Sequence, residues 1–368
     1  MNNNQTNTNN LPNNWEIREI GSIANLVTGN TPPKKNKAYW QNGVIDFIKP
    51  PDLINSTIKT FTEKISSLAE EKARTVNKGA ILVSCIGNIG RVGYVEQKTA
   101  FNQQINAIIP HQGLDNLFLF YAIQNQKQQI QNLASITTVP IVSKSKFSKV
   151  TIPLPPFLEQ KKIAAVLSAV QEAKEKTEKV IETTKELKKS MMKHLFTYGP
   201  ASVEDIDNIE LKNSEIGKIP ESWKIKQLGQ LGQFQYGYTT SATNENTGIK
   251  FIRITDINLD SNLIKWGKVP YAKISDKNYT KYFLKEGDIL IARIGATTGK
   301  TCIIEKDMEA IFASYLIRFN VKSEFIDANY IYQFTNTNKY WYQINSNKES
   351  KLKKGVSSTV LKSFLIGM

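Results

Sequence analysis

The fold is decided by a segment that opens with Pro153-Leu154-Pro155-Pro156-Phe157-Leu158-Glu159-Gln160. About 40 residues without glycine or proline follow this phrase, until Gly199-Pro200. Proline and glycine are the residues that interrupt helices. Their absence over this length, together with apolar residues at heptad spacing, predicts one long helix of the coiled-coil type over residues 157–198. At 1.5 Å per residue such a helix spans roughly 60 Å.

The predicted helix carries an apolar stripe along one side. Lysine and glutamate fill its other faces, in pairs such as Glu172 and Lys176, whose spacing of four residues stabilises a helix. A helix of this length needs a partner for its stripe, either the domains that flank it or another helix, and we expect two chains to self-associate through it. The residues expected at this helix-pairing interface are Ile163, Val166, Val170, Ala173, Thr177, Val180, Thr184, Leu187 and Met191.

The sequences on the two sides of the helix repeat each other. Residues 11–15, Leu-Pro-Asn-Asn-Trp, recur at residues 219–223 as Ile-Pro-Glu-Ser-Trp, and the copies then run in register at an offset of 208. Spacing that is kept over about 150 residues predicts two similar domains, at residues 11–156 and 219–368, with residues 199–218 as a linker.

Each copy is expected to be a mixed α/β domain. The fold class is therefore α+β, with two similar domains joined by one long helix. Short apolar runs after turn residues predict the strands, and aromatic residues at spacings of three and four predict the helices. The predicted strands are residues 44–49, 79–84, 249–254 and 287–292, and the predicted helices are residues 116–132 and 328–345.

Positive charge is spread over the whole sequence. The chain has 48 Lys and Arg against 33 Asp and Glu, a formal net charge of +15. Residues 11–156 have 16 basic against 9 acidic side chains, residues 157–198 have 9 against 6, and residues 199–368 have 23 against 18. A distributed excess favours a long polyanion such as double-stranded DNA over a single anionic pocket. A generally lysine-rich proteome would give the same count.

Composition excludes several classes of protein. Cys85 and Cys302 are too few for a disulfide scaffold or a cysteine-rich zinc site, and His111 and His194 leave little for a histidine metal centre, so no metal site is expected. No run of about 18 apolar residues predicts a membrane span. The Asn-rich residues 1–10 lack the apolar region of a signal peptide. They are expected to be a disordered tail, and the expected location is cytoplasmic.

Together, these features resemble the specificity subunit of type I restriction-modification systems. The resemblance covers residues 11–368 and depends on the Leu/Ile-Pro-x-x-Trp phrase that opens both copies and on Pro-Leu-Pro-Pro-x-x-Glu-Gln before the long helix. It implies that each copy is a target-recognition domain reading one half of a split DNA sequence, and that the helix is a spacer. It also implies partners: methyltransferase subunits, which use S-adenosylmethionine, and restriction endonuclease subunits, which use ATP and Mg²⁺. No cofactor is expected on this chain itself.

The second copy departs from the family pattern. Members of the family have a second proline-rich phrase and a second long helix after the second domain, whereas this sequence stops at Met368, where the counterpart of Pro153 would follow. The second spacer helix is therefore expected to be missing, either through truncation or rearrangement of the gene or because the chain borrows a helix from another chain. A regulatory scaffold that docks partner subunits without site-specific activity is an alternative.

Candidate DNA contacts follow from residue type and position. Basic side chains near the shared strands and turns suit phosphate or guanine, and amides suit adenine. Lys49 and Arg253 are favoured because both copies carry a basic residue there. A solvated surface charge or a turn amide is the alternative for each residue. The candidates are Lys34, Lys35, Lys49, Arg91, Asn102, Gln103, Gln104, Arg253, Arg293 and Lys300.

Two sequence patterns look catalytic. Residues 295–301, Gly-Ala-Thr-Thr-Gly-Lys-Thr, have three residues between the glycines where a phosphate-binding P-loop needs four, and a strand is predicted after them, so we interpret them as a β-turn. Asp52 with residues 70–72, Glu-Glu-Lys, could form the acidic site of a Mg²⁺-dependent nuclease, but the second copy keeps only Asp256. The chain is predicted to be non-catalytic, with a nuclease as the less favoured alternative.

Overall fold

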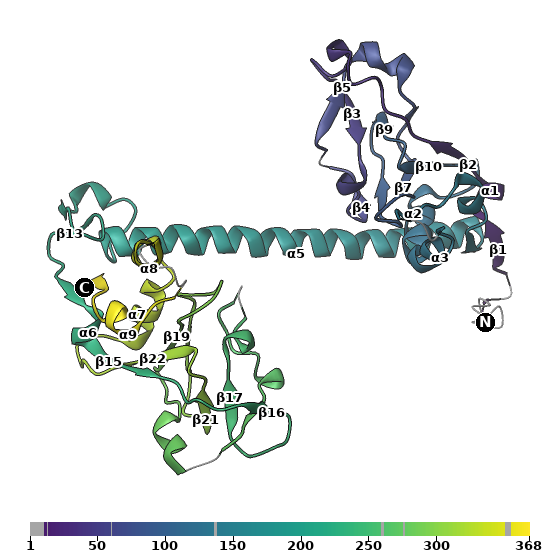
Figure 1. Ribbon diagram of the computed structural model, residues 1–368. Helices are drawn as coiled ribbons and strands as arrows, with labels where there is room; N and C mark the ends of the chain where they lie inside the picture. The colour runs from purple at the N-terminus through teal and green to yellow at the C-terminus, as the bar shows by residue number, and fades with distance from the viewer. Residues whose placement is uncertain are drawn as a thin grey trace. The chain divides into compact units, whose positions relative to one another are not determined.

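The computed structural model describes residues 11–12, 14–59, 61–135, 138–258, 261–274, 277–349 and 355–368. Its chain forms two compact units that divide between Val180 and Ile181, inside the long helix α5 (Phe157–Tyr198). Figure 1 labels the elements of both units. The tail predicted at residues 1–10 lies outside the described residues.

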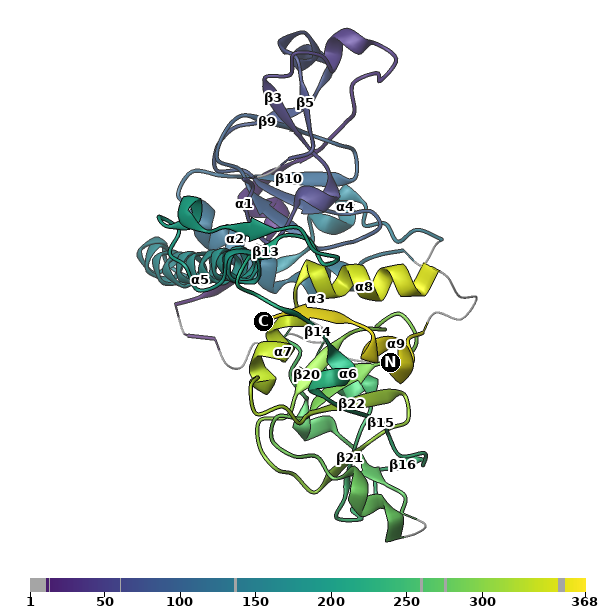
Figure 2. The same ribbon diagram turned by 90° about the vertical axis from the view of Figure 1, so that its left-hand side faces the viewer.

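The first unit is a mixed α/β domain. Its strands and helices before α5 are β1 (Glu16–Glu19), α1 (Ile20–Ile23), β2 (Ala24–Thr28), η2 (Lys37–Tyr39), β3 (Ile45–Ile48), η3 (Pro50–Asp52), β4 (Ser56–Thr57), β5 (Glu63–Ile65), η4 (Ser67–Lys72), β6 (Thr75–Val76), β7 (Ile81–Ser84), β8 (Val92–Tyr94), β9 (Thr99–Phe101), β10 (Ile105–Pro110), α2 (Asn116–Asn125), α3 (Lys127–Asn132), α4 (Lys144–Phe147) and β11 (Thr151–Leu154). One sheet has the order β2-β10-β7-β8-β4 and another has the order β5-β3-β9-β6, while β1 pairs with β11. Figure 2 shows β3, β5 and β9 at the end of this unit that is remote from α5.

The second unit is built in the same way. After α5 it contains η5 (Ile206–Asn208), β12 (Leu211–Lys212), β13 (Ile219–Pro220), β14 (Ile225–Gln227), α6 (Leu228–Leu231), β15 (Gly232–Tyr236), β16 (Ala242–Thr243), β17 (Lys250–Ile252), η6 (Ile254–Asp256), η7 (Trp266–Lys268), β18 (Tyr271–Ala272), η8 (Lys277–Tyr282), β19 (Ile289–Ala292), β20 (Thr301–Ile303), β21 (Ala310–Phe312), β22 (Leu316–Val321), α7 (Ala328–Phe334), α8 (Asn338–Glu349), α9 (Ser358–Lys362) and β23 (Leu365–Gly367). Its main sheets have the orders β15-β22-β19-β20 and β16-β18-β17-β21, and β14 pairs with β23.

The strand pairings confirm the repeat. The ladder β2-β10-β7-β8 corresponds to β15-β22-β19-β20, and the pair β1-β11 corresponds to β14-β23. The parallel pair β3-β9 has its counterpart in the parallel pair β17-β21. A parallel pair at the same place in two otherwise antiparallel ladders is a shared topological feature, so the two domains have one fold.

A pair of repeated glycines shows why the sequence pattern is kept. Gly29 follows β2 and lies against the backbone at the end of β9. Gly237 follows β15 and lies in the same way against the end of β21. A Cβ atom at Gly29 would lie 2.2 Å from the backbone oxygen of Asn102, and one at Gly237 would lie 2.2 Å from that of Ala313. Any side chain at these two positions would displace the strand ends, so both copies require glycine there.

Each unit has hydrophobic cores on both faces of one sheet, the one that contains β7 in the first unit and β19 in the second. In the first unit Ile81 and Val83 pack with the helices, while Leu82 points to the core that the two sheets share. In the second unit Ile289 packs with the helices, and Leu290 belongs to the core on the opposite face. This alternation is the period of two that a strand imposes on its side chains. It explains why residues 79–84 and 287–292 read as continuous apolar runs.

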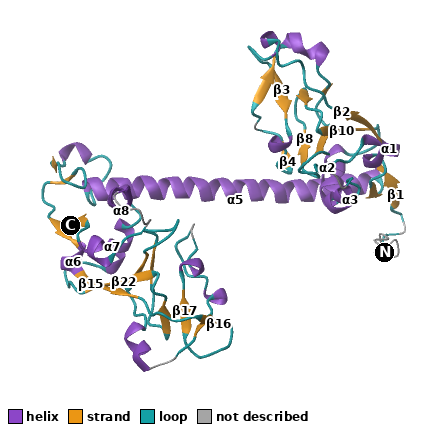
Figure 3. Cartoon of the chain, viewed as in Figure 1, coloured by secondary structure: helices purple, strands orange, loops and turns teal. Residues whose placement is uncertain are grey.

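The long helix has the bounds that the sequence predicts. Figure 3 shows it as one unbroken helix. It begins directly after Pro155-Pro156, where proline at a helix start sacrifices no internal hydrogen bond. It ends before Gly199, which has φ +75° and supplies the left-handed conformation common after the last helical residue. Among the described residues, no helix is both long and apolar enough to cross a bilayer.

Three parts of the structure differ from the prediction. Residues 116–132 form two helices, α2 and α3, because Gln126 leaves helical geometry with ψ 13°. Residues 328–345 are interrupted between α7 and α8, where the hydroxyl of Thr337 donates to the carbonyl of Phe334 at 2.7 Å and so competes with the helical pattern. Residues 199–218 are more than a linker, because β12 within them pairs with β13 at the start of the second copy.

Candidate DNA interface

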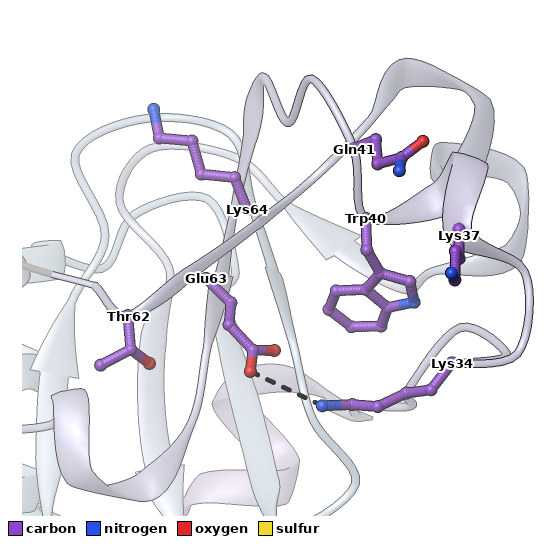
Figure 4. A pocket seen from close by; sticks show the side chains of 7 residues that line it. All are labelled: Lys34, Lys37, Trp40, Gln41, Thr62, Glu63 and Lys64. Carbon is purple, nitrogen blue, oxygen red and sulfur yellow. Dashed lines mark ion pairs between the residues drawn. The ribbon is translucent and has the colours of Figure 1, made fainter.

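A hollow of about 490 Å³ lies at the tip of the first domain, beside β5 and η2 (Figure 4). Figure 4 shows the Trp40 indole between Lys34 and Lys37, with its ring nitrogen on the side of Lys37. The Trp40 ring makes an edge-to-face contact with Phe47, with ring centroids 5.1 Å apart. The hollow is lined by Lys34, Lys37, Trp40, Gln41, Thr62, Glu63 and Lys64.

Two predicted DNA contacts meet at this tip. The carboxylate of Glu63 forms ion pairs with both Lys34, at 3.5 Å, and Lys49. The hydrogen bond from Lys49 holds the pKa of Glu63 below its usual range, so the carboxylate stays ionised. Lys35, the other lysine predicted in this loop, is exposed and does not line the hollow.

Lys49 and Arg253 occupy equivalent positions with a structural role in both domains. Each precedes a short 3-10 helix, and its backbone N–H donates to a carboxylate three residues later, Asp52 in one copy and Asp256 in the other. The guanidinium of Arg253 also binds Asp256 through Nε at 3.0 Å and Nη2 at 2.9 Å. The basic residue that both copies share is thus engaged with acidic neighbours. Its contact with DNA stays a prediction.

The other candidates of the first domain lie near the ends of β7 and β9. The guanidinium of Arg91 faces the side-chain amide of Asn88. Asn102 is buried and its amide bonds Gln104, while the exposed Gln103 accepts a hydrogen bond from Thr31 at 2.6 Å. The predicted amide cluster is therefore divided: Asn102 shapes the turn, and Gln103 is the member that faces solvent.

The other candidates of the second domain, Arg293 and Lys300, lie on the turn after β19. Arg293 stacks its guanidinium over the Tyr236 ring at 4.9 Å and donates to the carbonyl of Ser314 at 3.4 Å. Lys300 is half-buried at the end of the same turn. The structure brings Lys34 and Lys49 together at the tip of the first domain, Asn102 and Gln104 together after β9, and Arg293 and Lys300 together on the turn after β19.

The catalytic look-alikes have structural roles. Residues 295–301 form a turn that enters β20, with the Thr298 hydroxyl bonded to the carbonyl of Gly295, as the β-turn interpretation predicts. The Asp52 carboxylate caps η3. Among the described residues, no group of three or more His, Cys, Asp and Glu side chains is arranged to hold a metal ion.

The start of α5 is joined to the first domain by the two signature phrases themselves. The indole N–H of Trp15 donates to Glu159 at 2.9 Å, and the Asn14 amide donates to the other oxygen of the same carboxylate at 2.8 Å. The buried Gln160 donates to the carbonyl of Pro155 at 2.8 Å and accepts from the backbone N–H of Asp115 at 3.0 Å. These bonds fix the direction in which the helix leaves the domain.

The apolar stripe of α5 is open except at its start. Ile163 is half-buried and packs against the core of the first domain, and its part in helix pairing stays a prediction. From Val166 onward the stripe is exposed, and its larger members are between 52% and 64% accessible. These larger members are Val166, Val170, Val180, Leu187 and Met191. Ala173, Thr177 and Thr184 are exposed as well.

The sequence model of a family described as the type I restriction modification DNA specificity domain matches residues 12–189 and again residues 220–367. The chain belongs to this family. The two matches coincide with the two copies of the strand pairing, and the first match runs on into α5.

Two relatives are named as specificity subunits of type I restriction enzymes. The chain is 29% identical over 339 residues to the type I restriction enzyme MjaVIII specificity subunit of Methanocaldococcus jannaschii, covering 88% of this chain and 74% of the relative. It is also 29% identical over 264 residues to the MjaIX specificity subunit of the same organism, covering 68% of this chain but 60% of that relative. The chain therefore spans about three fifths to three quarters of the length of these relatives.

A solved structure shows the same fold. The S subunit of a type I restriction-modification system from M. genitalium superposes with a TM-score of 0.63 at 18% identity, over 97% of this chain and 86% of that one.

Several residues that line the tip hollow are not indicated by any pattern in the sequence. Trp40, Gln41, Thr62, Glu63 and Lys64 were not predicted, because the hollow forms only when β5 pairs with β3. The short basic run beginning at Lys34 was the one signal in the sequence that pointed to this place.

Proposed function

We propose that the chain is the sequence-specific DNA-binding specificity subunit of a type I restriction-modification complex. One observation carries the proposal: the family match occurs twice, and each occurrence coincides with one complete copy of the same sheet arrangement. Two DNA-binding domains that share one fold but differ at their tips can recognise a bipartite asymmetric target, because each tip contacts its own half-site.

The tips of the two domains differ where the scaffolds agree. In the first domain Lys64 forms an ion pair with Asp46 at 3.4 Å across β3 and β5. At the equivalent pair of strands in the second domain, the Lys250 ammonium lies 3.9 Å from the centre of the Tyr271 ring. Such changes alter the surface without altering the ladder, which supports recognition of two different half-sites.

The partners and chemistry follow from this role. The chain docks methyltransferase and restriction endonuclease subunits and is itself non-catalytic. S-adenosylmethionine, ATP and Mg²⁺ are bound by those partner subunits, and the complex acts on DNA in the cytoplasm. The structural use of the Asp52 carboxylate as a helix cap disfavours the alternative of a nuclease in this chain.

The exposed stripe of α5 supports a second part of the proposal. Apolar residues at a and d positions are self-complementary, and two such stripes bury each other in a coiled coil. We propose that a second copy of α5 covers the stripe from Val166 to Met191. The docking of a helix from another subunit is the alternative occupant.

Reconstitution tests the proposed function. The purified chain, its cognate methyltransferase subunits and labelled S-adenosylmethionine are mixed with plasmid DNA, and methyl transfer is followed with each protein alone as a control. We expect transfer only when both proteins are present. Co-purification of the subunits without methylation at defined sites would instead support the regulatory scaffold. Mg²⁺-dependent cleavage by the chain alone, lost in Asp52→Ala, would contradict the proposal.

A further inference from the structure

The hollow at the tip of the first domain has more positive charge than its own carboxylate can neutralise. Glu63 contacts two ammonium groups, those of Lys49 and Lys34. One carboxylate neutralises only one of them. Lys49 is the half-buried partner, whereas the side chain of Lys34 is 61% exposed and faces the hollow. Lys34 therefore retains the capacity to bind an anion.

Lys37 adds a second positive charge to the hollow. It is exposed, and it forms no ion pair with another described residue. Lys64, which also lines the hollow, is different because Asp46 lies 3.4 Å from its ammonium group. The ammonium group of Lys34 lies over the Trp40 ring, 5.0 Å from its centre, and Lys37 lines the same hollow.

Trp40 gives the hollow an apolar wall and an unused donor. Its indole nitrogen is buried and has no hydrogen-bond partner. A buried donor without an acceptor costs about 1–3 kcal/mol, and most such groups in proteins are satisfied. Figure 4 shows the ring nitrogen on the side of Lys37, whose side chain is exposed.

We infer that this hollow clamps a phosphate group of the DNA backbone beside the first half-site. Phosphate oxygens accept from the ammonium groups of Lys34 and Lys37 and from the indole N–H of Trp40, while the sugar packs on the indole face. The inference rests on the proposed function, and it assigns to the tip a positioning contact that carries no base information.

Salt dependence tests the clamp directly. The full chain is titrated with a 30-base-pair duplex of arbitrary sequence at several salt concentrations, and binding is followed by fluorescence anisotropy. For B-DNA, each phosphate contact contributes about 0.9 to the slope of log K against log salt. The double variant Lys34→Gln/Lys37→Gln is expected to lower the slope by roughly 1–2, according to whether the two lysines share one phosphate.

A matched control removes the same charge outside the hollow. Lys35 lies in the same loop and Lys78 in another turn, and both are exposed. Lys35→Gln/Lys78→Gln is expected to leave the slope close to that of the natural chain. Glu63→Gln acts in the opposite direction, because it removes the carboxylate that competes with phosphate for Lys34, and it is expected to strengthen binding. Thermal unfolding of each variant verifies the fold.

Several results would contradict the phosphate site at the tip and leave the proposed function unaffected. These are an unchanged slope in Lys34→Gln/Lys37→Gln, or an equal loss in the control pair. Competition by inorganic phosphate at constant ionic strength that disappears in the double variant would show a site for a small free anion instead. A change in the methylated motif of the complex would show base reading. Failure of the natural chain to bind duplex at all would count against the proposed function itself.

Discussion

Arg318 and Asp288 form a buried ion pair in the second domain, at two positions where the first domain has alanine. The Arg318 Nη1 group donates to Asp288 Oδ2 at 3.2 Å, and the two side chains are 14% and 0% exposed. The strand register matches Arg318 opposite Leu290 with Ala107 opposite Leu82. By the same register Asp288 corresponds to Ala80. Ala80 and Ala107 are both buried. The same two interior positions therefore hold two alanines in the first domain and an ion pair in the second.

Breaking this pair is expected to destabilise the second domain strongly. Asp288→Ala leaves the guanidinium buried without its carboxylate, and removal of one partner of a buried pair costs about 3–5 kcal/mol. The double change Asp288→Ala/Arg318→Ala recreates the arrangement of the first domain and is expected to cost less than the single change. Denaturant unfolding measures both. A double variant less stable than Asp288→Ala would contradict the equivalence.

Each domain contains one buried cysteine, whose reactivity should show whether that domain is folded. Burial raises the pKa of the Cys85 thiol and of the Cys302 thiol to about 12 in each case, so neither forms an appreciable amount of reactive thiolate at pH 8. We expect no reaction with a thiol-specific chromogenic reagent in the native chain and two reactive thiols in denaturant. The variant Cys85→Ala keeps only the thiol of the second domain, and Cys302→Ala keeps only the thiol of the first. Rapid reaction of either thiol in the native chain would show that its domain opens readily.

Gln160 should be essential for the joint between the first domain and α5. Gln160→Ala removes two hydrogen bonds, to Pro155 and Asp115, and is expected to cost about 2 kcal/mol at roughly 1 kcal/mol each. Lys161→Ala, at the exposed next position, serves as the control and should have little effect. The midpoint of thermal unfolding of the first domain compares them. Equal stability of the two variants would show that the joint depends on other contacts.

A charge placed in the α5 stripe should disrupt self-association. Val170 is 62% exposed at an a position, and Val170→Glu puts a carboxylate where the second helix is expected to pack. Sedimentation velocity should show a dimer for the natural chain and a monomer for the variant. Lys179→Gln, which changes the net charge by the same amount outside the stripe, should remain dimeric. A natural chain that is monomeric at all concentrations, or a dimer that survives Val170→Glu, would rule out this interface.

Local patterns in the sequence predicted the scaffold, because the scaffold depends on periodicity. The bounds of α5 follow from the absence of glycine and proline, and the strands after Gly79 and Gly287 follow from apolar runs that both copies share. The break at Gln126 was missed because glutamine is an ordinary helix former and nothing beside it signals a turn.

The contacts that give the domains their individual surfaces could not be predicted in this way. Glu63 meets Lys49 only because β5 pairs with β3, and Trp15 meets Glu159 across 144 positions of sequence. Both phrases that contain Trp15 and Glu159 were recognisable, yet neither indicates that it binds the other. Side chains that meet through tertiary packing leave no periodic trace in a single sequence.

Mapping of methylated bases shows whether this chain supplies two different readers of one DNA site. Long-read sequencing of DNA from cells that express the chain with its methyltransferase, against cells with the methyltransferase alone, detects every modified position. We predict one split motif whose two halves differ and are separated by a fixed number of unspecified bases. Methylation that is independent of the chain, or confined to a single uninterrupted motif, would contradict it.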